Sequence, residues 1–169
     1  LPRVATERAM QLSGPQIPKG KLLPAMHPPV IVKRTYVPVS CKKTAAGGLL
    51  FDFGQNMAGF FEVTLRGRAG QKVRLSAVEK LDQDGQPLPC CNTWCRYILV
   101  GDTEEMWRPR FTYQAGRWLH VQPDDEEREL PEVVGVRAYS VTSSAQDTGN
   151  FSCSDVRLMQ VHYLIVKAA

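Results

Sequence analysis

The 169 residues suffice for one domain with a substantial core, and 43% of them are hydrophobic while 22% are charged. The net charge of +4 comes from 21 basic and 17 acidic residues scattered along the chain, without the clustered basic face of a nucleic-acid-binding protein. No apolar run approaches the roughly 18 residues that a membrane-spanning helix needs. The totals therefore favour an ordinary globular domain and argue against nucleic acid or a membrane as a partner.

The first 29 residues are expected to form an extended arm or linker. Six prolines lie there among polar and basic residues, and each proline fixes φ and removes a backbone donor. The chain begins with a charged stretch rather than with an initiating Met or an apolar signal core, so we expect it to be an internal piece of a longer product.

After this arm, short apolar or alternating segments separated by turn residues predict strands. The expected strands are residues 30–39, 49–53, 60–66, 72–79, 96–100, 110–113, 118–122, 133–141 and 149–152. Prolines in the first of them suit an edge strand, and the strands 60–66 and 72–79 are expected to pair as a hairpin. No intervening segment is long enough for the helix of a parallel crossover, which predicts an all-β, antiparallel β-sandwich.

The end of the chain changes to a helical pattern. Ser154 and Asp155 are good helix caps, and Leu158, Val161 and Ile165 follow a helical period. Such a helix exposes an apolar stripe unless something packs on it, so we expect its partner surface to lie in sequence outside this chain. The expected organisation is an arm over residues 1–29, a sandwich domain over 30–152 and a helix over 153–169.

No metal or cofactor is expected. The five cysteines, an odd number, lack the spacing of a zinc site, and the three histidines are far apart in the sequence. The acidic run within residues 124–129 is expected to be a solvated loop rather than a metal cage. The segment Asp82-Gln83-Asp84-Gly85 resembles the start of a calcium loop, but a hairpin turn is the favoured interpretation, because the twelfth position is Thr93 rather than Glu.

Two kinds of functional side chain have candidates in the sequence. Glycoside cleavage requires a pair of carboxyl groups, for which the candidates are Asp52, Glu62, Glu79, Asp82 and Asp84. Asp52 precedes a turn, so accepting backbone hydrogen bonds from residues 54–56 is its favoured role. Aromatic rings that stack on sugars have as candidates Trp94, Trp107, Tyr113 and Trp118, with packing in the sandwich core as the favoured alternative.

Residues 51–61 read Phe-Asp-Phe-Gly-Gln-Asn-Met-Ala-Gly-Phe-Phe, and this run resembles a motif of bacterial α-L-rhamnosidases of glycoside hydrolase family 78. Further segments resemble the family in the same order, among them Arg66-Gly67 with Ala69-Gly70, Tyr97-Ile98-Leu99, residues 109–113 and residues 151–154. The resemblance covers approximately residues 22–166. It implies a jelly-roll or concanavalin-like sandwich that precedes a catalytic helical barrel carrying the catalytic carboxylates.

The resemblance implies a noncatalytic accessory domain of a multidomain enzyme that hydrolyses terminal α-L-rhamnosides, with no catalytic residue in this chain. The expected partners are the catalytic helical-barrel domain of the same polypeptide and rhamnose-containing glycans. Two alternatives remain. The chain is an autonomous carbohydrate-binding module, or it is a glycosidase by itself that depends on Asp52.

Overall fold

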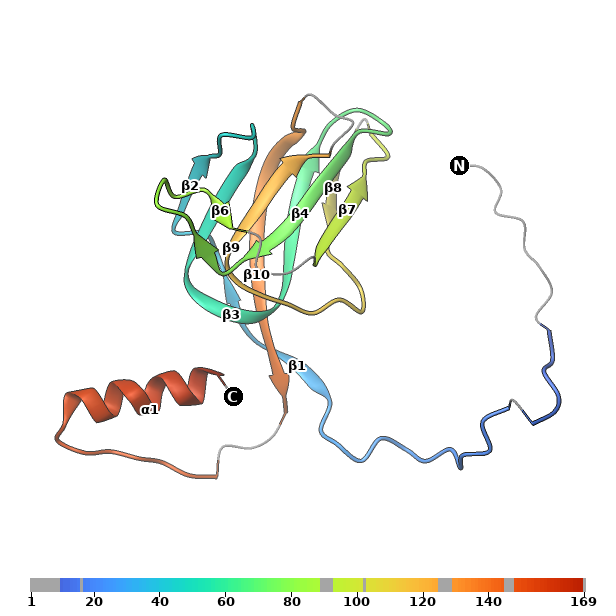
Figure 1. Ribbon diagram of the computed structural model, residues 1–169, viewed down its shortest axis with the longest axis vertical. Coiled ribbons are helices and arrows are strands. Elements are labelled where there is room, and N and C mark those ends of the chain that lie inside the picture. The colour runs from blue at the N-terminus through green and yellow to red at the C-terminus, as the bar shows by residue number, and fades with distance from the viewer. Residues whose placement is uncertain are drawn as a thin grey trace.

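The protein is described by a computed structural model for residues 10–15, 17–88, 93–101, 103–124, 129–144 and 148–168. Ten strands and one helix lie within these ranges (Figure 1). In chain order they are β1 (Val30–Tyr36), β2 (Ser40–Lys43), β3 (Leu49–Arg66), β4 (Lys72–Val78), β5 (Lys80–Leu81), β6 (Pro87–Leu88), β7 (Trp94–Ile98), β8 (Glu104–Trp107), β9 (Gln114–Pro123), β10 (Glu132–Ser143) and α1 (Val156–Ala168).

Eight of the described strands form an antiparallel sheet that curls into two layers joined along β3, and β5 and β6 form a separate two-stranded sheet. The order is β1-β10-β3-β9-β4-β7, and β2 and β8 also pair with β3. The first part of β3 pairs with β2 and β9, whereas its last part pairs with β10 and β8. One long strand therefore belongs to both layers, and the predicted antiparallel β-sandwich is confirmed.

The core fills the space between these two layers. Alternate residues on β4 and β9 meet alternate residues on β10 and the last part of β3, because successive side chains of a strand point to opposite faces. The buried cluster includes Phe53, Phe61, Val63, Leu65, Val73, Leu75, Leu119, Val121, Val136 and Ala138. Each layer thus has an apolar inner face that forms the core and an outer face that does not contribute to it.

The predicted hairpin between residues 60–66 and 72–79 is wrong. β4 pairs with β9 and β7, not with β3, and the turn at residues 67–70 leads from one layer to the other. Val63 and Leu65 therefore belong to the same core cluster as Val73 and Leu75. The alternation of apolar and polar residues predicted both strands correctly, but it does not determine which strands are neighbours.

Two further expected strands are absent from their described positions. Phe111 lies in residues 110–113 with φ 57, a left-handed conformation that a strand does not contain. In residues 149–152 no strand forms, and Phe151 instead packs on His162 of α1 with ring centroids 5.1 Å apart. Strands β2, β5, β6 and β8 were not predicted.

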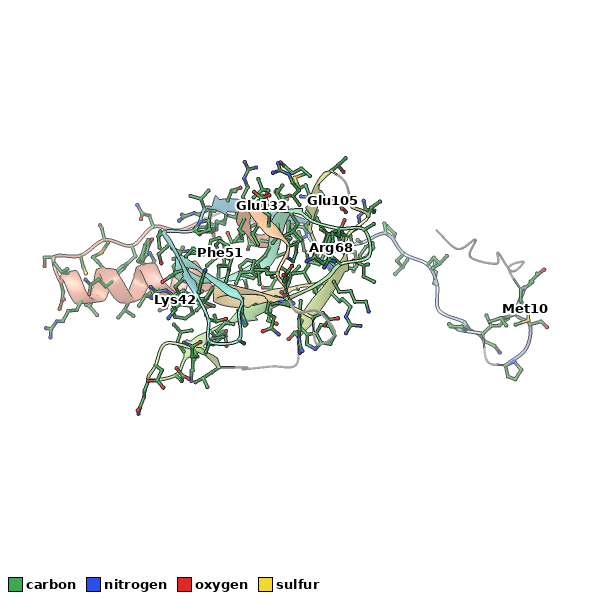
Figure 2. The ribbon with its side chains drawn as sticks, turned by 90° about the horizontal axis from the view of Figure 1, so that it is seen from above. Met10, Lys42, Phe51, Arg68, Glu105 and Glu132 are labelled. Atoms are coloured by element: carbon green, nitrogen blue, oxygen red, sulfur yellow. The ribbon has the colours of Figure 1, made fainter. Side chains whose placement is uncertain are left out.

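The helix and the edge strand were predicted correctly. β1 pairs with β10 alone, and α1 begins after Asp155, whose Oδ1 accepts a hydrogen bond of 2.8 Å from the amide of Arg157. The arm extends away from the sandwich (Figures 1 and 2) and is exposed throughout its described residues, whereas Tyr163 and Val166 of α1 line a hollow together with Tyr36 of β1. Within the part of the chain that the structure describes, no helix is both long and apolar enough to span a bilayer.

Candidate functional site

A wide bulge interrupts the pairing of β3 with β9 at the sequence motif. Asp52 pairs with Trp118 and Met57 pairs with Gly116, so residues 53–56 oppose Arg117 alone. The extra residues bend β3 at the point where it passes from one layer to the other. The motif therefore builds the junction of the sandwich.

The carboxylate of Asp52 links the two strands at this bulge. Its two carboxylate oxygens accept hydrogen bonds of 2.8 Å each from Nε and Nη2 of Arg117, and Oδ1 also accepts the amide of Gly54 at 2.7 Å. The hydrogen bond from Arg117 is the main reason that the pKa of Asp52 is lowered. The predicted backbone contact is confirmed, and the bidentate partner Arg117 was not foreseen.

Two glycines of the motif are required by geometry. Gly54 has φ +78 within the bulge, a conformation that side chains disfavour. At Gly59, a Cβ atom would lie 1.8 Å from the carbonyl oxygen of Tyr139 on β10. The motif glycines thus permit the bend and the close approach of the neighbouring strand.

Three of the other candidate carboxylates, those of Glu62, Asp82 and Glu79, have structural contacts. Glu62 is buried and accepts a hydrogen bond of 2.9 Å from the hydroxyl of Tyr139. Asp82 accepts the amide of Gln86 at 2.6 Å in the turn between β5 and β6, which confirms the predicted hairpin turn. Glu79 is exposed, and its Oε1 accepts a hydrogen bond of 3.4 Å from the side-chain Nδ2 of Asn56. Each of these contacts accounts for its carboxylate as part of the framework.

The acidic run after β9 contains one buried member. Asp124 is 1% exposed and pairs with Nε of Arg96 at 2.6 Å, so the expectation of a fully solvated loop is wrong at this position. Residues 125–128 lie outside the described residues, as do Cys90 and Cys91. Among the residues that are described, no three His, Cys, Asp or Glu side chains are grouped closely enough to hold a metal ion.

The four aromatic candidates do not form one site. Trp107 stacks on Tyr97 with ring centroids 5.2 Å apart. The guanidinium carbon of Arg117 lies 4.7 Å from the ring centroid of Trp118. Tyr113 is exposed at the edge of a different hollow, which α1 also lines. Trp94 is the one candidate that lines the cavity described next.

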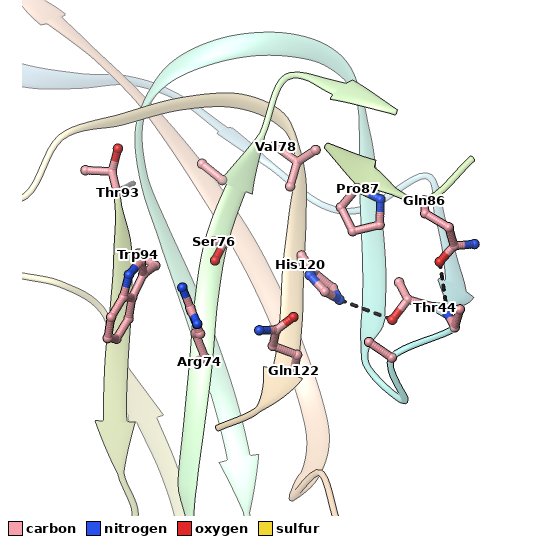
Figure 3. A pocket seen from close by; sticks show the side chains of 13 residues that line it. Thr44, Arg74, Ser76, Val78, Gln86, Pro87, Thr93, Trp94, His120 and Gln122 are labelled. Carbon is pink, nitrogen blue, oxygen red and sulfur yellow. Dashed lines mark hydrogen bonds between the residues drawn. The ribbon is translucent and has the colours of Figure 1, made fainter. Parts of the chain in front are cut away.

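This cavity of about 430 Å³ lies on the outer face of β4, β7 and β9 (Figure 3). Its floor consists of the outward residues Arg74 and Ser76 of β4 and His120 and Gln122 of β9. Trp94 of β7 bounds one side, and the β2–β3 turn and the start of β6 bound the other. A volume of this size is typical of small-molecule sites.

Arg74 and Trp94 form the most clearly organised contact of the cavity. The guanidinium carbon of Arg74 lies 4.2 Å from the ring centroid of Trp94, within the range of a cation–π interaction. Arg96 lies 5.4 Å from the same ring, but its charge is paired with Asp124. Arg74 lies at the cavity on a strand that is paired on both sides.

His120 is buried in the wall opposite Trp94. Its Nε2 lies 3.2 Å from Oγ1 of Thr44, which itself accepts the amide of Gly48 at 3.1 Å. Burial lowers the pKa of His120, and the positive charge of Arg74 lowers it further. At neutral pH the imidazole is accordingly uncharged, and Arg74 is the charged side chain among the described residues that line the cavity.

The residues of the floor were missed by sequence reasoning. Arg74 and Ser76 occupy the polar positions of a strand whose alternation was recognised, and His120 and Gln122 lie on a second expected strand. Because these strands were not known to be neighbours, nothing in the sequence brought the four side chains together. The pairing of Ser76 with His120 and of Arg74 with Gln122 supplies that information.

Comparison with known proteins matches most of the chain to one domain family. Residues 42–141 match the family described as bacterial alpha-L-rhamnosidase concanavalin-like domain. An alpha-L-rhamnosidase of Formosa agariphila is 28% identical over 155 residues, which are 86% of this chain and 16% of that protein. The chain thus spans about a sixth of this curated relative.

Solved structures give the same result. The alpha-L-rhamnosidase from Dictyoglumus thermophilum superposes with a TM-score of 0.76 at 25% identity, over 88% of this chain and 17% of that one. The Streptomyces avermitilis alpha-L-rhamnosidase complexed with L-rhamnose gives a TM-score of 0.71 at 26% identity, over 83% and 14% respectively. The match therefore covers nearly the whole of this chain and a small part of each enzyme.

Proposed function

The chain belongs to the bacterial alpha-L-rhamnosidase concanavalin-like domain family, and from this premise we propose that it is a noncatalytic accessory domain of a multidomain α-L-rhamnosidase-like glycoside hydrolase. Residues 30–152 are the sandwich domain, residues 153–169 lead toward a catalytic helical barrel of the same polypeptide, and residues 1–29 are an arm or linker. The parent enzyme hydrolyses terminal α-L-rhamnosides with carboxylates outside this chain.

The observation that carries this proposal is the apolar surface of α1. Leu158, Val161, Leu164 and Ile165 are all more than half exposed, and an exposed apolar stripe of this kind marks an interaction surface. Tyr163 of α1 and Tyr113 of the sandwich also line a hollow of about 230 Å³ between helix and sheet. A neighbouring domain that packs on α1 would bury this surface.

The bonds of the motif also support a noncatalytic role. Asp52 is held by Arg117 and by the amide of Gly54, and its lowered pKa suits an ion pair rather than a proton donor. We expect no turnover of an aryl α-L-rhamnoside by the chain alone. Turnover that disappears in an Asp52→Asn variant would make the chain a glycosidase and overturn the proposal.

The packing role is tested in the natural full-length polypeptide. Leu164→Asp places a charge on the surface of α1, so we expect it to lower the thermal midpoint of the catalytic domain and to reduce rhamnosidase activity. Leu22→Asp is the matched control, because Leu22 is a 98% exposed leucine of the arm. Equal effects of the two substitutions, or no effect of Leu164→Asp, would contradict packing on α1.

A second function, carbohydrate binding, is favoured by the cavity that Trp94 lines. An aromatic ring beside hydroxyl and amide groups is typical of sugar sites. Calorimetric titration of the chain with L-rhamnose tests this function. Saturable binding that is lost in Trp94→Ala supports a carbohydrate-binding module, whereas the absence of heat supports the accessory role alone.

A further inference from the structure

We propose that the loop between β8 and β9, residues 108–113, is a docking site for another part of the same polypeptide, which receives the ring of Phe111 in an apolar hollow with carboxylates at its rim. This inference deepens the accessory role and rests on it. It names a second contact of the sandwich with its neighbouring domain, in addition to the surface of α1.

The backbone of Phe111 is the first argument. Among the described residues, Phe111 is the one non-glycine residue with a positive φ, which is 57°. This left-handed conformation costs free energy in any residue that has a Cβ atom, and bulky residues rarely adopt it. Such strain persists where other contacts compensate for it, and it is concentrated at functional sites.

The compensating contact does not lie within the described part of the chain. The side chain of Phe111 is 108% exposed, so none of the described residues covers its ring. By contrast, Phe53 packs on Phe61 and Phe60 packs on Tyr139. A large apolar ring that is held in solvent on a strained backbone is typical of an anchor that a partner buries.

The position of the loop indicates which partner this is. Tyr113, at the end of the loop, lines the same hollow as Tyr163 and Val166 of α1, and Figure 1 shows the loop at the end of the sandwich that faces α1. The loop and α1 therefore form one continuous surface. The relatives, of which this chain spans about a sixth, contain further chain that is able to pack there.

The charge of the loop indicates the chemistry of the partner surface. Arg108 and Arg110 are both exposed, and no carboxylate among the described residues forms an ion pair with either. The guanidinium of Arg108 lies 5.6 Å from the ring centroid of Phe60. Arginine and aromatic residues are enriched at the energetic centres of interfaces, so an apolar hollow with Asp or Glu at its rim is the complementary surface.

The first test is Phe111→Gly, because this substitution removes the ring and the backbone strain together. In the chain alone, we expect the thermal midpoint to rise by about 1–3 °C, since glycine adopts a positive φ without the cost of a Cβ atom. In the natural full-length polypeptide, we expect the thermal midpoint to fall, because a buried contact is lost. Phe111→Ala removes the ring and retains the strain, so it should lower the midpoint in the full-length polypeptide without raising it in the chain alone.

Hydrogen exchange locates the contact. The amides of residues 110–113 should exchange at least about tenfold more slowly in the full-length polypeptide than in the chain alone, and Phe111→Gly should remove most of this protection. Val100→Gly is the matched control, because Val100 is 73% exposed in the loop between β7 and β8, beside the turn at residues 67–70. It should leave the exchange of residues 110–113 unchanged.

A pair of arginine substitutions tests the charge of the partner surface. Arg110→Gln should reduce the protection of the loop in the full-length polypeptide at low salt, and the difference from the parent should shrink as salt is added. Arg68→Gln is the control, since Arg68 is also exposed and lies in the turn at residues 67–70. Equal effects of the two substitutions would refute an acidic partner surface at the loop.

The remaining outcomes also overturn the inference. Equal exchange of residues 110–113 in the two contexts, or protection that survives Phe111→Gly, would refute docking of the ring. A lower thermal midpoint of the chain alone in Phe111→Gly would mean that the ring stabilises its own domain, and protection that depends on protein concentration would assign the loop to a second copy. If Leu164→Asp destabilises the full-length polypeptide while the loop stays unprotected, the accessory role stands and this inference alone fails.

Discussion

Leu65 of the sandwich is fully buried, whereas Leu164 of α1 is 64% exposed. The sandwich contains its own core, because the two layers joined by β3 cover each other's apolar faces. The helix has the same kind of side chains in a regular helical period but nothing among the described residues that covers most of them. A regular pattern is thus sufficient to predict a local structure, and it does not determine what that structure packs against.

If the sandwich is stabilised by its own core, the largest loss in the free energy of unfolding should follow from a substitution where β3 passes between the two layers. Gly59→Ala places a Cβ atom 1.8 Å from the carbonyl oxygen of Tyr139, so β3 and β10 must separate or the backbone must shift. We expect a loss of at least about 4 kcal/mol in the free energy of unfolding, measured by urea denaturation, which places the variant among the severest single substitutions.

The control for Gly59 lies on the partner strand. At Gly135 of β10 an added Cβ would meet Thr64 at 3.8 Å, an ordinary contact. We expect Gly135→Ala to change the free energy of unfolding by less than about 1 kcal/mol. Similar losses for the two variants would show that strand glycines matter here for reasons other than close approach.

A pair of leucine substitutions tests the comparison directly. Leu65→Ala removes a fully buried side chain and should cost about 2–5 kcal/mol through lost burial and the cavity that remains. Leu164→Ala should change the free energy of unfolding of the same chain by less than about 0.5 kcal/mol, because the side chain is exposed. Urea denaturation measures both losses. A loss of unfolding free energy for Leu164→Ala as large as that for Leu65→Ala would contradict the comparison.

The next effect concerns the ion pair that closes the bulge. Asp52→Asn removes the charge that Arg117 contacts through two hydrogen bonds, and we expect a cost of about 1–3 kcal/mol at pH 7. The lower half of this range is favoured in high salt, since Arg117 is 41% exposed.

The pH dependence of this cost has a defined sign. The pKa of Asp52 is lowered in the folded chain, so the unfolded state binds a proton first as pH falls below about 4. The stabilisation is present above that pH and is lost below it. Denaturation curves of the Asn variant and the parent chain should therefore converge in acid, and a constant difference down to pH 2 would contradict the ion-pair account.

The sequence predicted the features that depend on nearby residues. Alternation in residues 72–79 indicated a half-buried strand, Gly54 indicated left-handed backbone geometry and Asp155 indicated a helix start, and all three are confirmed. The expected interruption of the strand at residues 54–56 is wrong, because Leu49–Arg66 is one continuous strand with a bulge. The bidentate contact from Arg117 lies 65 residues from Asp52, and the floor of the cavity combines β4 with β9. Such contacts depend on strand order, which local periodicity does not encode.

Strand order also explains the main errors. Residues 60–66 and 72–79 are separated by a short turn that is compatible with a hairpin, and equally with a passage from one layer to the other. The second arrangement is adopted because both strands direct apolar residues into one core from opposite sides. At Phe111 the left-handed backbone is a local event, but a bulky residue gives no sequence signal for it.

The smallest expected effect comes from removing α1. A chain that ends at Ser152 should retain the parent's free energy of unfolding within about 0.5 kcal/mol, because none of the α1 side chains that the structure describes belongs to the buried core. The same truncation should reduce self-association in analytical ultracentrifugation, since it removes an exposed apolar stripe. A loss above about 1 kcal/mol would instead mean that Tyr163 and Val166, which line the hollow beside Tyr36, stabilise the sandwich themselves. The helix would then be part of the domain, and its exposed leucines alone would be left to receive a neighbouring domain.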